Sequence, residues 1–151
     1  MWVRASVAAF GLVVLGVVWG GVGGGPAHAA TVQVGTAAEL VEAITSANAD
    51  PGADTIRFSA DITLTEVDNT TDRPNGLPSV TSSITLEGDG NTLAGSDLPA
   101  FRLLHVAAAG SLTIRDLTLS GARNHEHHGG GILNKGTLTM SGGLGSYGLG
   151  L

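Results

Sequence analysis

Three short segments of the chain repeat one alternating pattern: "SITLEG" (Ser83–Gly88), "SLTIRD" (Ser111–Asp116) and "TLTMSG" (Thr137–Gly142). Apolar residues alternate with threonine, which is the period of a β-strand that buries one face. Ile84, Leu112 and Leu138 hold the same place in the three segments, so the interval from one segment to the next is nearly constant. A constant interval of roughly 20–50 residues predicts a solenoid, in which each repeat lies on the one before it.

Each repeat contains further short strand-like segments separated by Gly, Asn, Asp and Ser. They are "NTLAG" (Asn91–Gly95), "LTLSG" (Leu117–Gly121), "RLLH" (Arg102–His105) and "GILN" (Gly131–Asn134). No segment after Ala49 keeps helical spacing, which excludes helical repeats, and the fixed asparagine of leucine-rich repeats is missing. About three short strands per repeat therefore predict a parallel β-helix of about three coils, each one strand spacing from the last.

In such a fold, equivalent side chains form columns along the stack. The predicted inward columns are Ile84, Leu112 and Leu138, then Leu86, Ile114 and Met140, then Leu93 and Leu119. Threonines 85, 113 and 139 form an outward column, which suits a β-branched but polar side chain. Before the repeats, the same period of two places Ile56, Phe58, Ile62 and Leu64 on one side, with Arg57 on the other.

The segment that precedes these strands predicts a short strand, "TVQV" (31–34), followed by an amphipathic helix over Ala37–Asn48. Thr36 and Glu39 have the spacing of a capping box, in which each side chain bonds to the other residue's backbone. Pro51-Gly52 ends the helix. Leu40, Val41, Ile44 and Ala47 share one helical face, which we expect to cover the exposed end of the first coil.

These residues carry a family resemblance that covers Thr31 to about Gly142. "AELVEAITSANADPGADTIRF" resembles the N-terminal segment of bacterial secreted right-handed parallel β-helix proteins, the pectate-lyase-like group that includes relatives of the polymorphic outer membrane proteins. "LPSVTSSITLEGDGNTLAG" and "GGGILNKGTLTMSG" resemble the first coils of these proteins. The resemblance implies a right-handed solenoid at an extracellular address. It implies no single activity, because this fold carries lyases, hydrolases, adhesins and passive surface proteins.

The segment from Met1 to Ala29 has the layout of a secretory signal. Arg4 supplies the basic start, an apolar stretch runs from Val7 to Val18, and Ala27-His28-Ala29 is a small-residue cleavage site. We expect cleavage between Ala29 and Ala30. The alternative is a membrane anchor, but a spanning helix needs about 20 apolar residues, more than the stretch from Val7 to Val18 provides.

The resulting organisation is a signal peptide at 1–29, a capping strand and helix at 30–50, β-helix coils at 51–140 and a glycine-rich tail at 141–151. The tail is too short for a coil, which suggests a truncated product, a fragment with an uncapped C-terminal end through which it could self-associate.

The charge of the chain argues against one class of function, and its cysteine content indicates how the domain is stabilised. Removing Arg4 with the signal peptide leaves six of the seven basic residues against 13 acidic ones, and there is no basic patch, which argues against nucleic-acid binding. Cysteine is absent, so a secreted domain of this size depends on packing and hydrogen bonding rather than on disulfides.

The "HEHH" run at His125–His128 is the one candidate metal site. His125 and His127 would share a face of an extended chain, with Glu126 or His128 as a further ligand. The alternative is a polar loop before three glycines, because adjacent histidines in a loop lack the supporting hydrogen bonds that orient metal ligands. We therefore predict a loop and assign no metal ligand and no cofactor.

Polysaccharide cleavage is the enzymatic alternative, since hydrolases on this fold need paired carboxylates and lyases a base with clustered acids. The charged residues available in the coils are Glu87, Asp89, Asp97, Asp116, Arg102 and Arg115. No two of the acids share a column, so no catalytic residue is predicted. Glu87 and Arg115, one coil apart in neighbouring columns, are expected to form an exposed ion pair.

His105 aligns with Asn134 when "LLH" is laid over "ILN", and both are predicted to be structural rather than catalytic residues, with the asparagine at a bend. The sequence as a whole predicts a secreted or cell-surface β-helix scaffold for adhesion or surface coverage, and it indicates no enzymatic activity within the chain. Expected partners are extracellular polysaccharide or a cell surface. The alternative is the N-terminal part of a polysaccharide lyase or glycoside hydrolase of the pectate-lyase-like fold.

Overall fold

The computed structural model describes residues 28–96, 99–121, 131–142 and 149–150. This part of the chain is mostly β-structure with one short helix. The elements, in chain order, are β1 (Thr31–Val34), α1 (Ala37–Ala49), β2 (Ala53–Phe58), β3 (Ile62–Leu64), β4 (Ser83–Glu87), β5 (Thr92–Gly95), β6 (Leu104–Val106), β7 (Ser111–Arg115), β8 (Thr118–Ser120), β9 (Ile132–Asn134), β10 (Thr137–Ser141) and β11 (Leu149–Gly150).

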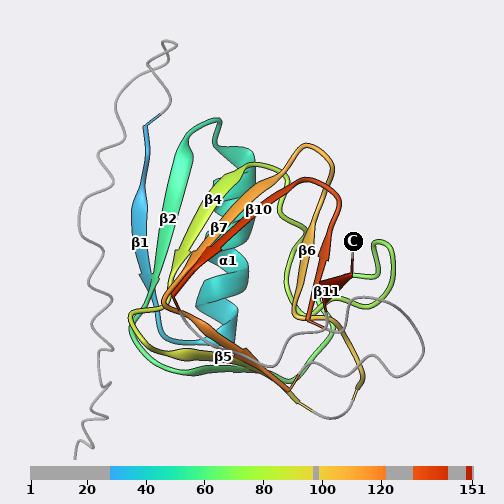
Figure 1. The fold of residues 1–151 in the computed structure, drawn as a ribbon. Helices are drawn as coiled ribbons and strands as arrows, with labels where there is room; N and C mark the ends of the chain where they lie inside the picture. The colour runs from blue at the N-terminus through green and yellow to red at the C-terminus, as the bar shows by residue number, and fades with distance from the viewer. Residues whose placement is uncertain (1–27, 97–98, 122–130, 143–148, 151) are drawn as a thin grey trace, which may run out of the picture.

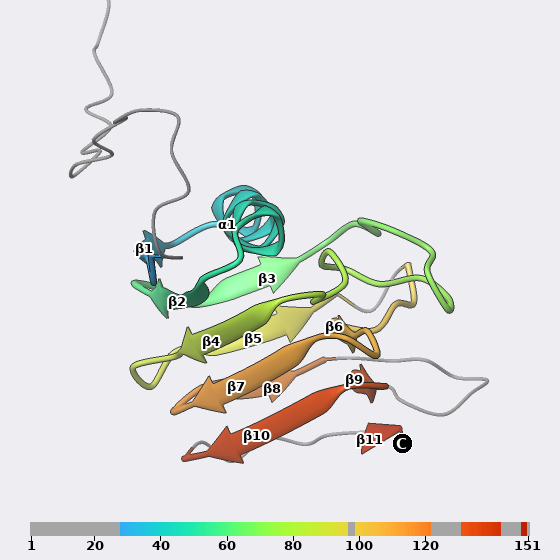
Figure 2. The same cartoon turned by 90° about the horizontal axis from the view of Figure 1, so that it is seen from above.

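The strands form three sheets, and every pair of neighbouring strands is parallel. One sheet has the order β1-β2-β4-β7-β10, the second β3-β5-β8 and the third β11-β9-β6. From β4 to β9, the chain passes twice through the first, second and third sheets in that order, and β10 then returns to the first sheet (Figure 1). Figure 2 shows these passages lying one below another, with α1 at the end of the stack beside β1, β2 and β3.

The predicted columns are confirmed by the strand register. Leu112 is paired with Ile84 on one side and with Leu138 on the other, and Ile114 is paired with Leu86 and Met140. Leu93 is paired with Leu119, and the three threonines pair in the same way. The inward aliphatic residues of β4, β5, β7 and β8 are at most 2 % exposed, which places the core between the sheets.

The stack also includes a layer that the repeat pattern did not identify. Ile56 of β2 pairs with Leu86, and Ile62 of β3 pairs with Leu93, so β2 and β3 continue two of the predicted columns. Asp54 occupies the position of the Ile84 column and breaks its apolar pattern. The interval from Ile56 to Leu86 is 30 residues, close to the 28 residues from Leu86 to Ile114, so this layer has nearly the same period as the later ones.

Helix α1 closes one end of this core, as predicted. Leu40 and Ile44 are fully buried and Ala47 nearly so, whereas Val41 is only half-buried. The capping box is present: the Thr36 hydroxyl accepts from the Glu39 N–H at 3.2 Å, and the Glu39 carboxylate accepts from the Thr36 N–H at 3.2 Å. The helix ends at Ala49, before Pro51.

The predicted equivalence of His105 and Asn134 is wrong. In the third sheet, His105 pairs with Leu133, and Asn134 pairs with Val106. The shift arises because the Gly131 carbonyl accepts from both the Leu103 and Leu104 N–H groups, each at 3.1 Å, so that two residues oppose one.

Several predictions fall outside the described residues: the signal peptide up to residue 27, Asp97, the His125–His128 run and residues 143–148 and 151 of the tail. In the part that the structure describes, no helix is long and apolar enough to cross a membrane.

Candidate functional site

A buried histidine in β6 lies at the centre of a polar cluster. His105 is 2 % exposed, and its Nδ1 lies 2.8 Å from the Ser79 hydroxyl oxygen. Its Nε2 lies 3.3 Å from an Asp72 carboxylate oxygen. Because strand side chains alternate, His105 points away from its core-facing neighbours Leu104 and Val106. It is therefore buried beneath the segment that runs from Asp72 to Ser79 rather than in the hydrophobic core.

Two cations complete the cluster. Lys135 Nζ lies 2.7 Å from the same Asp72 carboxylate oxygen that faces His105. Arg102 is 1 % exposed, and its guanidinium donates to the Asn75 side-chain oxygen at 3.0 Å and to the Asp72 carbonyl at 3.3 Å. An arginine buried this deeply is stable only when its donors are satisfied. We refer to these six residues as the Asp72–His105 cluster: Asp72, Asn75, Ser79, Arg102, His105 and Lys135.

Burial and charge set the protonation states in this cluster. Burial lowers the pKa of His105, Arg102 and Lys135 lower it further, and Asp72 partly opposes them. The hydrogen bond from Lys135 holds the pKa of Asp72 below its ordinary value. At neutral pH the imidazole is therefore uncharged. We assign its proton to Nε2, which faces the Asp72 carboxylate, so the Ser79 hydroxyl donates to Nδ1.

The cluster has the components of an acid–base site, but its geometry favours a structural role. Ser79, His105 and Asp72 are connected in the order of a hydrolase triad, which could activate the serine hydroxyl. However, the Nε2 contact with Asp72 is not a well-aligned hydrogen bond. The same residues bind the Asp72–Ser79 segment to β6, together with the Val80 N–H, which donates to the His105 carbonyl at 2.8 Å.

Several of the charged residues predicted in the coils lie on the outer face of the five-stranded sheet. Arg57, Glu87 and Arg115 are directly paired in one row across β2, β4 and β7, so the assignment of Glu87 and Arg115 to neighbouring columns is wrong. The predicted Glu87–Arg115 ion pair is confirmed at 3.8 Å, and Arg57 approaches Glu87 at 3.4 Å and Asp89 at 2.9 Å. These groups are mostly exposed, so the pairs contribute little to stability.

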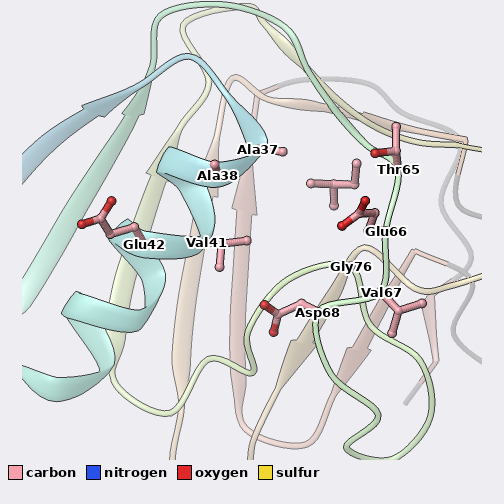
Figure 3. A pocket seen from close by; sticks show the side chains of 10 residues that line it. Ala37, Ala38, Val41, Glu42, Thr65, Glu66, Val67, Asp68 and Gly76 are labelled. Atoms are coloured by element: carbon pink, nitrogen blue, oxygen red, sulfur yellow. The ribbon is translucent and has the colours of Figure 1, made fainter.

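A cavity of about 570 Å³ lies beside the start of α1. Ala37, Ala38 and Val41 form its helical wall, and the chain from Leu64 to Asp68 forms the opposite wall. In Figure 3, the carboxylates of Glu66 and Asp68 point toward the helix, whereas that of Glu42 points away. None of the lining residues belongs to the Asp72–His105 cluster, so the two features are separate.

Metal binding has no support within the described ranges. No group of three or more His, Asp or Glu side chains there is arranged to hold a metal ion. His105 lies in the cluster, but the histidines of the His125–His128 run lie outside the described residues.

Sequence patterns missed most of the Asp72–His105 cluster. Arg102 and His105 stand out within the repeats, but Asp72, Asn75 and Ser79 belong to an excursion between β3 and β4 that meets the β6 region through two single parallel bridges, Asn75 with Arg102 and Val80 with Val106. Asp72 and Arg73 both have positive φ, at 54° and 109°. Such a backbone conformation is uncommon in non-glycine residues and gives no reliable signal in a single sequence.

Comparisons with known proteins do not assign the chain to a family. No family model matches the chain. No curated protein and no solved structure matches it either.

Proposed function

We propose that the protein is a secreted right-handed parallel β-helix that serves as an extracellular or cell-surface scaffold, in adhesion or surface coverage. The observation that carries this proposal is the parallel register, in which successive passages of the chain place their strands side by side in the same three sheets. Parallel strands joined by crossovers are right-handed in about 98% of cases, which supports the proposed hand. The resemblance to bacterial secreted β-helix proteins is part of the same proposal.

The outer surface supports a role in binding rather than in chemistry. The threonine row on β4, β7 and β10 is flanked by the row Arg57, Glu87 and Arg115, so polar groups recur at the spacing between strands. A regular polar surface of this kind suits an extended partner such as an extracellular polysaccharide. The buried part of the Asp72–His105 cluster is already occupied in holding the Asp72–Ser79 segment.

The second candidate is the N-terminal part of a polysaccharide lyase or glycoside hydrolase. The Asp72–His105 cluster favours this enzymatic function, because the cluster places a neutral imidazole beside a serine hydroxyl and a carboxylate, and a lysine beside the same carboxylate. In this alternative, His105 would be the general base and Lys135 would attract an acidic sugar.

Incubation of the purified protein with acidic polysaccharides, with and without calcium, distinguishes the two functions. The scaffold proposal predicts co-sedimentation with insoluble polysaccharide and no new reducing ends or unsaturated products. Cleavage that disappears in His105→Gln, but persists in the outer-row control Glu87→Gln, would refute the scaffold proposal and support the enzyme. A protein that neither binds nor cleaves would contradict the polysaccharide as a partner.

A further inference from the structure

The buried carboxylate of Asp54 accepts a hydrogen bond from the backbone N–H of Ala30. The Asp54 Oδ1 atom lies 2.9 Å from the Ala30 nitrogen, and the Asp54 residue is only 6 % exposed. The position of Ala30 is fixed by a second contact, since its carbonyl accepts from the Thr55 N–H at 2.8 Å. The nitrogen is therefore held over the carboxylate just before β1.

Asp54 is an exception in its column. The residues that follow it in the stack are Ile84, Leu112 and Leu138, all apolar. A carboxylate at a buried position is costly unless a positive or hydrogen-bonding group faces it. A small cavity of about 80 Å³ adjoins the site, and its lining contains a second carboxylate, Asp50, and no basic side chain.

The sequence predicts that a positive charge is produced at this nitrogen. Ala27-His28-Ala29 has the pattern of a cleavage site for a secretory signal, and His28, Ala29 and Ala30 are all exposed. Hydrolysis of the Ala29–Ala30 bond adds OH from water to the Ala29 carbonyl carbon. The Ala30 nitrogen takes the remaining proton and a further one from solvent to become an ammonium group.

We propose that the protein is processed between Ala29 and Ala30 by a leader-cleaving peptidase, and that Asp54 is the receptor for the α-ammonium group freed at Ala30. The proposal rests on the secretion proposed above. Before cleavage, Asp54 accepts from a neutral amide. After cleavage, the same contact becomes a charge-assisted hydrogen bond, which is shorter and stronger. Asp50, the other charged group that lines the cavity, adds to the attraction for the new cation.

The amine content of the chain provides a direct test. Lys135 is the only lysine, so a chain that begins at Ala30 has two amines, the α-amine and Lys135 Nζ. The full-length gene is expressed in a secreting bacterium, and mass spectrometry of the exported product identifies its first residue. An amine-reactive ester at neutral pH then labels both amines, and the labelling rate of each is followed by peptide mapping.

The expected product begins at Ala30, and its α-amine is labelled about tenfold more slowly than in Asp54→Asn, the factor that corresponds to one pKa unit. Glu42→Gln, which removes an exposed acid on α1, should leave the rate unchanged. If Asp54→Asn does not fold, the wild-type protein is compared with and without urea, where unfolding should accelerate α-amine labelling by the same factor.

The outcomes separate the two proposals. An exported chain that begins at Ala30 but is labelled at equal rates in wild type and Asp54→Asn, or equally with and without urea, refutes the receptor role alone. An exported chain that begins at another residue refutes the processing site. A chain that is not exported refutes the proposed secretion, and this inference with it.

Discussion

Replacement of Leu112 by alanine should be among the most destabilising single changes in the protein. Leu112 is fully buried in β7, between Ile84 and Leu138 in the same column. Losing three buried carbons costs about 2.4 kcal/mol at roughly 0.8 kcal/mol each. The incompletely filled cavity adds about 1 kcal/mol. The expected loss in the free energy of unfolding is therefore about 3–4 kcal/mol.

Two control variants make this prediction specific to the column. Leu138→Ala makes the same chemical change in β10, where the side chain is only partly buried, and should cost about 1–2 kcal/mol. Thr113→Ala changes the neighbouring residue, which faces outward, and should cost less than about 1 kcal/mol.

Urea unfolding of the three purified variants, followed by far-ultraviolet circular dichroism, measures these differences. With a slope of about 1–3 kcal/mol per molar urea, Leu112→Ala should lower the midpoint by roughly 1–4 M. Equal losses for Leu112→Ala and Thr113→Ala would refute the inward orientation of Leu112, and equal losses for Leu112→Ala and Leu138→Ala would refute the difference in their burial.

Further predictions concern the polar groups. Burial lowers the pKa of His105, so the unfolded chain binds a proton at this residue more readily than the folded chain does. The contribution of the neutral imidazole to the free energy of unfolding is therefore fully present above about pH 6.5, and it is lost as the pH falls toward the folded-state pKa. His105→Gln should remove this part of the pH dependence of the urea midpoint, and an unchanged profile would contradict a neutral buried imidazole. Lys135→Met should raise the pKa of Asp72 toward its ordinary value of about 3.9, as measured by carbon-detected NMR titration, and an unaltered titration would show that Lys135 does not bond to Asp72 in solution. Thr36→Ala removes the hydroxyl that accepts from the Glu39 N–H and should cost about 1 kcal/mol in urea unfolding, whereas Thr45→Ala, a change of the same type on the exposed side of α1, should cost less; equal losses would argue against the capping box.

The strand columns were predictable from the sequence because their signal is local and repeated. Each of β4, β7 and β10 alternates apolar residues with threonine, and the alternation alone determines which side chains face inward. The capping box of α1 was predictable for the same reason, since Thr36 and Glu39 lie within one helical turn of each other.

The register of the third sheet was less predictable. "RLLH" offers two adjacent leucines for one inward position, and the sequence does not indicate which of them pairs with Ile132. In the structure Leu104 does, because the Gly131 carbonyl accepts from the N–H groups of both leucines. A one-residue ambiguity of this kind changes the face on which every following side chain lies. The error at His105 and Asn134 follows from it.

The Asp72–His105 cluster could not be predicted because its members come from distant segments. Asp72 lies in the excursion before β4, His105 lies in β6, and Lys135 follows β9, so only the stacking of the strands brings them together. Asp54 is a similar case, since its role depends on Ala30, from which it is separated in the sequence by β1 and α1.

Methyl-to-methyl nuclear Overhauser effects across β4, β7 and β10 test the parallel register most directly. We predict contacts of Ile84 with Leu112 and of Leu86 with Ile114, together with a contact between Leu112 and Leu138. Antiparallel strands centred on Thr85 and Thr113 would instead bring Ile84 to Ile114 and Leu86 to Leu112. Observation of the second set of contacts, or the absence of any contact between Leu112 and Leu138, would contradict the stacked parallel fold.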